Sequence, residues 1–208
     1  MGKSGVNIAV FGIASNFILF LIKLYVGISS NSLAIYCDSV NNLGDTFSCL
    51  IALFGFIFMI KTNEKKGRRI QSLCSFIIGS IVAVTGAYCV YSGLERFMYP
   101  VLVSYSFKYA MLILLTAFVK LVMAMVYIIK SRKAPSPVYK ALILDSLLDF
   151  GLTITAILGF YLVEKLNYAI DGVFGIIIGI IILAAAAKSV WQQAKIPMDC
   201  WSSLMAAS

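Results

Sequence analysis

The stretch YAIDGVFGIIIGIIILAAAAKSVWQQA, residues 168–194, indicates the class of fold. Its middle is almost wholly apolar, and a helix of about 20 such residues spans the hydrocarbon core of a bilayer. A continuous helix also satisfies its own backbone hydrogen bonds in lipid. Further apolar runs occur at about 6–28, 32–60, 70–98, 101–129 and 137–163. The sequence therefore predicts an all-α membrane protein with six transmembrane helices.

The composition of the whole chain supports this prediction. Hydrophobic residues make up 61% of the 208 residues and charged residues 12%, and the mean hydropathy is +0.96. A soluble domain of this length would expose much of that apolar surface to water, so we expect the lipid bilayer to surround the chain. The formal net charge of +8 would suggest a nucleic-acid partner in a soluble protein, but here the charges cluster between hydrophobic runs. No nucleic-acid partner is expected.

Basic residues gather in two linkers, after the second apolar run and around the break after the fourth. Cytoplasmic loops carry an excess of lysine and arginine, so these linkers are predicted to be cytoplasmic. Six crossings then place both termini in the cytoplasm, and we expect a multi-pass protein of a cell membrane, the plasma membrane of a prokaryote. Residues 1–208 are expected to form a single transmembrane domain without a separate soluble domain. The basic residues are Lys61, Lys65, Lys66, Arg68, Arg69, Lys130, Arg132, Lys133 and Lys140.

Prolines and cysteines give further expectations. Pro135 and Pro137 mark the start of the fifth helix, where the missing N–H of proline costs little. Pro100 is expected in a turn, and Pro197 is expected to end the sixth helix.

The cysteines show no Cys-x-x-Cys pair, so we expect thiols that pack as small hydrophobic groups and no disulfide framework. They are Cys37, Cys49, Cys74, Cys89 and Cys200.

Aspartates in the second and fifth apolar runs give the strongest functional signal. An aspartate in the middle of a membrane helix costs about 2.5–3.5 kcal/mol, so it needs a partner or a wet cavity. Asn41 and Asp45 are four residues apart, as are Asp145 and Asp149, so each pair shares one helical face. Three ionised carboxylates facing one another would repel strongly, so we predict that they bind a cation. Asp38 is expected beside these ligands rather than among them.

The alternative is that these groups only hold helices together by hydrogen bonds, as polar side chains often do in membranes. That explanation suits Ser39 and Asn42 well. It does not suit three carboxylates, which need a cation or protons between them.

The residue types also indicate which cation is expected. The sequence contains no histidine, whereas zinc sites usually recruit histidine or cysteine. Carboxylate and amide oxygens suit Mn²⁺, Mg²⁺ and Fe²⁺. Cys49, four residues after Asp45, offers a soft ligand on the same face, although a buried core thiol is the favoured interpretation. Manganese is therefore the leading candidate for the bound cation, and no separate resident cofactor is expected.

Two lysines and one aspartate inside the apolar runs need separate explanations. Lys23 is expected to extend toward the membrane interface. Lys120 lies about 15 Å from Lys130 along a helix, near the middle of the membrane. It is expected either to balance the surplus carboxylates or to bind backbone carbonyl groups. Asp171 is expected to cap a helix or interact with its dipole at the start of the sixth helix, not to bind metal.

With these residues in place, the sequence resembles the cation diffusion facilitator family. The resemblance is carried by the stretch from Asn16 to Gly27, by Ser32-Leu-Ala, by Asp38-Ser-Val-Asn-Asn-Leu-Gly-Asp45 and by Asp145-Ser-Leu-Leu-Asp149. It implies a six-helix exporter of divalent metals that exchanges metal for protons, commonly as a homodimer. The family's ligand positions map onto Asn41, Asp45, Asp145 and Asp149.

Departures from the family's zinc members refine this expectation. Asn41 and Asp145 stand where zinc members usually have histidine, and together with Lys120 they resemble the manganese-exporting branch. The stretch 61–69 lacks the family's usual histidines. We also expect the chain to lack the cytoplasmic domain that commonly follows the sixth helix in the family, in which case a homodimer would have to form through the membrane helices. A zinc or iron(II) exporter remains the alternative within the family.

Other classes of membrane protein also carry intramembrane aspartates. A CDP-alcohol phosphotransferase has a similar size but needs an Asp-Gly-x-x-Ala-Arg core, and the Asp171-Gly172 pair is followed by Val-Phe-Gly. An intramembrane aspartyl protease needs a Gly-x-Gly-Asp context, which neither Asp45 nor Asp149 has. We therefore expect that the chain is not an enzyme. A membrane scaffold that binds no metal is the third possibility.

Overall fold

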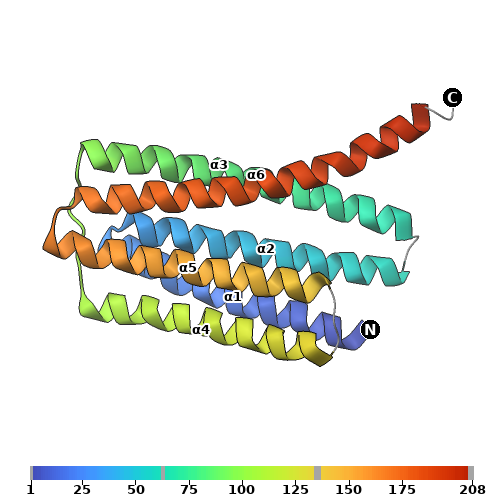
Figure 1. Cartoon of the computed structure of the whole chain (residues 1–208), viewed down its shortest axis with the longest axis horizontal. Coiled ribbons are helices and arrows are strands. Elements are labelled where there is room, and N and C mark those ends of the chain that lie inside the picture. The colour runs from blue at the N-terminus through green and yellow to red at the C-terminus, as the bar shows by residue number, and fades with distance from the viewer. Residues whose placement is uncertain (1, 62–63, 134–136, 206–208) are drawn as a thin grey trace.

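The structure is a computed structural model that describes residues 2–61, 64–133 and 137–205. Within these ranges the chain forms six helices joined by short links (Figure 1). Both termini lie at the same end of the bundle, as an even number of crossings requires (Figure 1). The helices are α1 (Gly2–Ser30), α2 (Leu33–Lys61), α3 (Glu64–Met98), α4 (Phe107–Lys133), α5 (Pro137–Lys165) and α6 (Ala169–Met205).

The lengths and apolar character of these helices fit a membrane. Among the described residues, five helices contain a segment long and apolar enough to cross a bilayer: Val10–Ser30, Phe76–Met98, Phe107–Arg132, Leu142–Lys165 and Ala169–Lys188. The helix α2 is not among the five, and it carries Asp38 and Asp45. The all-helical fold is confirmed, and the sixth crossing, by α2, stays a prediction.

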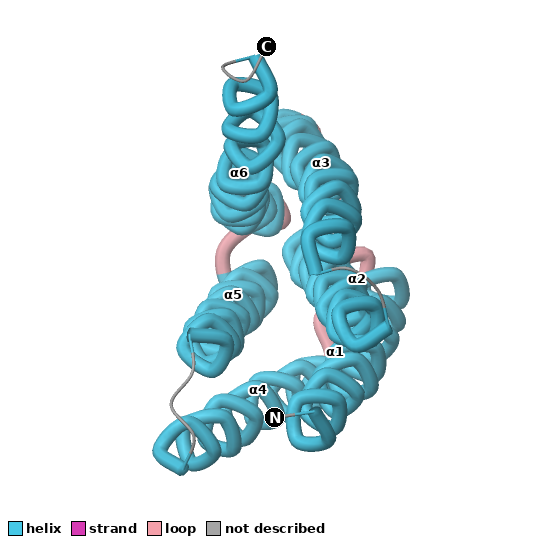
Figure 2. The backbone as a smooth tube through the Cα atoms, turned by 90° about the vertical axis from the view of Figure 1, so that its right-hand side faces the viewer, coloured by secondary structure: helices cyan, strands magenta, loops and turns pink. Residues whose placement is uncertain are grey.

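The six helices fall into two groups. Helices α3 and α6 pack mainly on each other, whereas α1, α2, α4 and α5 form the rest of the bundle (Figures 1 and 2). Glycines allow the close approach of α3 and α6: a Cβ on Gly93 would lie 2.8 Å from the carbonyl oxygen of Gly172, and one on Gly86 would lie 2.9 Å from the backbone nitrogen of Leu183. Small residues permit such backbone contact between membrane helices.

Helix limits differ from the sequence-based expectation at two places. Residues 101–106 were expected in the fourth helix but precede α4, which begins at Phe107. This segment crosses the end of the bundle, where the N–H of Ser104 donates to the carbonyl of Ser30 at 2.9 Å and Val103 is buried. The expected end of the sixth helix at Pro197 is also wrong, because α6 continues to Met205. Proline removes one helical hydrogen bond, and a helix can continue through it with a kink.

The other prolines agree with expectation where they are described. Pro137 is the first residue of α5, and Pro100 lies in the link between α3 and α4. Pro135 lies outside the described residues, as do the side chains of Cys74, Cys200, Lys133, Lys140 and the basic residues at 61–69.

The expectation of cysteines without disulfides is corrected by a bond between two helices. Cys37 in α2 and Cys89 in α3 form a disulfide, with their Cα atoms 6.1 Å apart. This separation lies in the usual range for disulfides. The two residues are 52 positions apart in the sequence, so no short spacing motif announces the pair. The bond ties α2 to the α3 and α6 pair.

Asp171 caps a helix, as expected, but the helix is α2 rather than its own. From the first turn of α6, its carboxylate accepts hydrogen bonds from the N–H of Leu33 at 2.7 Å and from the hydroxyl of Ser32 at 2.6 Å. It also pairs with Arg96 of α3 at 3.1 Å. Free N–H groups at a helix start favour such an acceptor. Asp171 therefore joins α2, α3 and α6 at the end of the bundle opposite the termini.

Candidate metal centre

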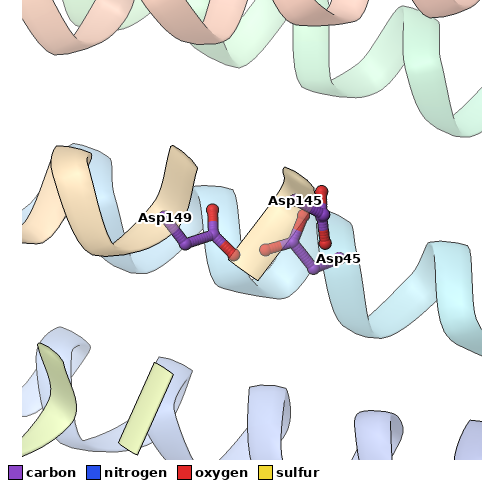
Figure 3. Close-up of side chains that lie close together, drawn as sticks. All are labelled: Asp45, Asp145 and Asp149. Atoms are coloured by element: carbon purple, nitrogen blue, oxygen red, sulfur yellow. The ribbon is translucent and has the colours of Figure 1, made fainter. Parts of the chain in front are cut away.

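Three aspartates from α2 and α5 converge at one point in the bundle. Asp45, Asp145 and Asp149 each offer a carboxylate oxygen, and these oxygens all lie within 4.8 Å of one another (Figure 3). Oxygen ligands bind divalent cations at about 2.0–2.6 Å, so oxygens on opposite sides of one ion are about 4–5 Å apart. The spacing of the three carboxylates therefore suits a single divalent ion.

The cluster lines a cavity of about 310 Å³ between the two groups of helices. One wall comes from α2 and α5, and the facing wall comes from apolar or small residues of α3 and α6, including Val82, Ile182 and Ala186. All four predicted ligands, Asn41, Asp45, Asp145 and Asp149, line this cavity. The i, i+4 pairs on α2 and α5 thus face the same space, as the sequence predicted.

Asn41 interacts with the cluster through its amide nitrogen. Its Nδ2 donates to Asp149 Oδ1 at 2.6 Å. In this arrangement Asn41 orients a carboxylate, and its role as a ligand stays a prediction. To act as a ligand it would turn its amide oxygen toward the ion, since nitrogen of an amide donates and does not coordinate.

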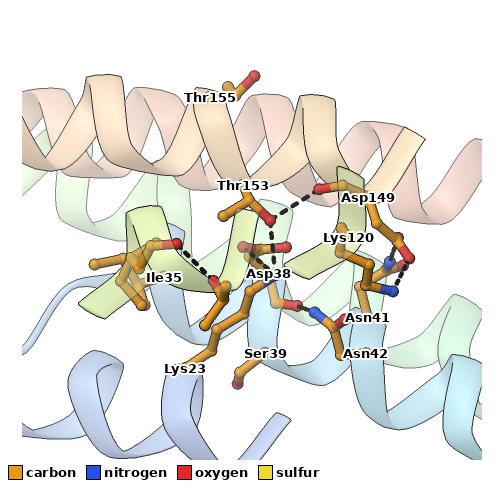
Figure 4. Close-up of polar contacts among 12 residues, drawn as sticks. Lys23, Ile35, Asp38, Ser39, Asn41, Asn42, Lys120, Asp149, Thr153 and Thr155 are labelled. Carbon is orange, nitrogen blue, oxygen red and sulfur yellow. Dashed lines mark hydrogen bonds and ion pairs between the residues drawn. The ribbon is translucent and has the colours of Figure 1, made fainter. Parts of the chain in front are cut away.

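Lys120 of α4 lies directly against the carboxylates. Its ammonium donates to Asp149 Oδ2 (Figure 4) and lies 3.5 Å from Asp45 Oδ2. It also donates to Asn16 Oδ1 of α1 at 2.8 Å. Lys120 was expected either to balance the carboxylates or to bind backbone carbonyl groups. In the structure it pairs with the carboxylates. Both oxygens of Asp149 are therefore occupied, one by Lys120 and the other by Asn41.

The expected position of Lys23 at the membrane interface is wrong. Lys23 is fully buried, its ammonium lies 2.9 Å from Asp38 Oδ2, and it donates to Thr153 Oγ1 at 2.7 Å (Figure 4). A buried partner of opposite charge removes the need to reach water. Asp38 is not among the residues that line the cavity, and its expected role beside the ligands stays a prediction.

Cys49 does not join the cluster. Among the described residues, the group able to hold a metal consists of the three aspartates. The thiol of Cys49 faces α1, because a Cβ on Gly12 would lie 3.2 Å from its sulfur. Packing against a neighbouring helix is the interpretation that the sequence favoured.

Two polar residues near the site had no role assigned from sequence. Asn16 is 3% exposed and holds Lys120, and Thr153 is fully buried and binds Lys23. Both residues could have been noticed in the sequence, because a polar side chain inside an apolar run needs a partner, as the aspartates do. The rule identifies such residues without naming their partners.

A multi-pass helical bundle with carboxylates in a cavity among apolar helices is typical of a membrane protein that carries cations. The family model for the cation efflux transmembrane domain matches residues 9–196. The chain therefore belongs to the cation efflux family. It is a multi-pass membrane protein that transports metal cations. No curated protein matches the chain.

Proposed function

We propose that this chain exports Mn²⁺ from the cytoplasm in exchange for protons, with Asn41, Asp45, Asp145 and Asp149 as the ion ligands. The observation that carries the proposal is the group of three carboxylate oxygens within 4.8 Å of one another in a cavity between two groups of helices. Hard oxygen ligands and the absence of histidine favour Mn²⁺ over Zn²⁺. Zn²⁺ and Fe²⁺ are the alternative substrates.

The two groups of helices support an alternating-access mechanism. The cavity lies between α2 and α5 on one side and α3 and α6 on the other, so a change in the angle between the groups would open it to one face of the membrane or the other. Protons and the ion compete for the same carboxylates. Protonation from outside releases the ion, and loss of protons to the cytoplasm allows the next ion to bind.

The remaining parts of the proposal concern orientation and assembly. Both termini face the cytoplasm of a prokaryotic cell. This orientation is supported by the positive-inside rule, because the helix ends that flank the two basic stretches of sequence lie at the same end of the bundle as the termini (Figure 1). The protein acts as a homodimer that forms through its membrane helices.

A flux assay in liposomes tests the proposal. A pH gradient is expected to drive Mn²⁺ transport by the reconstituted chain. Asp45→Ala and Asp149→Ala are each expected to reduce that flux to the level of empty liposomes, because each removes a ligand from a site with few ligands. Glu164→Ala, which removes an exposed carboxylate at the end of α5, is the matched control and should retain full flux.

Competition in the same assay identifies the ion. Excess Mn²⁺ and Fe²⁺ are expected to inhibit flux more strongly than Zn²⁺ or Mg²⁺. Unimpaired flux in both aspartate variants would contradict the proposed site. Strong preference for Zn²⁺ would contradict the argument from oxygen ligands and support the alternative zinc exporter.

A further inference from the structure

Lys120 places its ammonium group beside the carboxylates of the candidate metal centre. Its side chain is 1% exposed, and its ammonium contacts Asp149 and Asn16 and lies 3.5 Å from Asp45. These partners come from α5, α1 and α2, so the ammonium is enclosed by the bundle. A lysine held so deeply cannot extend to the headgroups.

The charges around the cavity add up to a specific value. When all three aspartates are ionised, as an ion bound by all three requires, they contribute three negative charges, and the ammonium of Lys120 contributes one positive charge. The sum is two negative charges, equal and opposite to one divalent cation. Uncompensated charge is costly in a low-dielectric interior, so this balance favours an ion of charge two over an ion of charge three.

The position of Asn16 shows how Lys120 can stay near the site when an ion is bound. An ion that takes Asp149 Oδ2 displaces the ammonium from that oxygen, but Asn16 Oδ1, at 2.8 Å, still accepts a hydrogen bond from it. Asn16 is uncharged and does not line the cavity. The lysine therefore keeps a partner, and its charge remains beside the carboxylates.

We propose that Lys120 is a specificity-determining residue that sets the charge of the transported ion at two. The proposal rests on the proposed function, since it assumes that Asp45, Asp145 and Asp149 bind the ion. Lys120 repels a trivalent ion more strongly than a divalent ion, because Coulomb repulsion scales with the charge of the ion. A purely structural lysine, which only joins α4 to its neighbours, would affect both ions alike.

Binding of Tb³⁺ and Mn²⁺ to the purified full chain in detergent tests the role of Lys120. Tb³⁺ luminescence gives one dissociation constant, and displacement of Tb³⁺ by Mn²⁺ gives the other. Lys120→Met is expected to shift the ratio of the two constants toward Tb³⁺ by about tenfold or more. Protons compete with both ions for the same carboxylates, so their effect cancels in the ratio.

Matched variants separate charge from packing. Lys120→Gln is expected to shift the ratio as Lys120→Met does, while its amide can still contact Asn16. Lys120→Arg keeps the charge and should keep the wild-type ratio. Lys23→Met combined with Asp38→Asn removes another buried lysine without changing the charge at the cavity, and should also keep it.

Each outcome has a distinct meaning. An unchanged ratio in both Lys120→Met and Lys120→Gln would overturn the role of Lys120, as would an equal shift in Lys120→Arg. If the wild-type chain binds neither ion, the proposed function fails and the inference fails with it. A wild-type chain that binds Mn²⁺ but shows no shift in the variants leaves the proposed function intact.

Discussion

Lys23 and Asp38 form an ion pair that water does not reach. Their charged atoms lie 2.9 Å apart, and both side chains are fully buried. In such a setting each charge depends on the other, because an unpaired charge in low dielectric costs several kcal/mol. The pair joins α1 to α2, and Thr153 extends it to α5. Its role is to hold three helices together beside the cavity.

A double-mutant cycle tests this role. Lys23→Met alone is expected to destabilise the protein by about 3–5 kcal/mol, because it leaves Asp38 buried without its partner. Asp38→Asn added to Lys23→Met should recover much of that loss, since no unpaired charge remains. Thermal denaturation in detergent measures both effects. Equal losses in the single and double variants would contradict the interpretation.

Helices α3 and α6 illustrate how small residues set the distance between elements. Gly86 and Gly93 are seven residues apart on α3, as are Gly172 and Gly179 on α6. A Cβ on Gly172 would lie 2.6 Å from the carbonyl oxygen of Gly93, and one on Gly179 would lie 2.9 Å from the backbone nitrogen of Val90. Backbone cannot move aside as a flexible side chain can, so these positions accept no larger residue.

Substitution at this contact should therefore weaken the pair of helices. Gly93→Leu and Gly172→Leu are each expected to cost about 1–3 kcal/mol or more through overpacking, seen as a lower midpoint of thermal denaturation. Gly151→Ala is the control, because a Cβ there meets no atom within 4 Å. It should keep or slightly raise stability, since alanine favours a helix. Equal losses at all three glycines would contradict the packing argument.

The whole molecule has two ends of different character. The end that holds the termini also holds the last turns of α2 and α4 and the first turns of α3 and α5 (Figure 1). Asp171 in the first turn of α6 and Arg96 in the last turn of α3 form an ion pair. The positive-inside rule relates the first end to the cytoplasm. In the orientation proposed above, the ion enters the cavity from the cytoplasmic side and leaves on the other side.

Reporter fusions test this orientation in cells. Alkaline phosphatase, which is active only outside the cytoplasm, should be inactive when fused after Ser208 and active when inserted after Asn167, in the link between α5 and α6. The two fusions control for each other, because they differ only in the side of the membrane. An active enzyme after Ser208 would reverse the proposed direction of transport.

The sequence by itself predicted the helices and the acidic residues that share one face of α2 and one face of α5. Long apolar runs require helices in lipid, and the i, i+4 spacing in α2 and α5 places Asn41 beside Asp45 and Asp145 beside Asp149 on their helices. Both are local properties, set by the rise and turn of one helix. These four residues line one cavity because the polar face of α2 and the polar face of α5 turn toward the same space.

Only the tertiary structure decided which helices meet and which side chains become partners. Lys23 pairs with Asp38, Asp171 caps α2, and Cys37 bonds to Cys89, although each pair is distant in the sequence. A helical pattern shows that a polar residue needs a partner, but the packing of separate helices selects it. The same reason explains Asn16, which the sequence left without a role and which the bundle places beside Lys120.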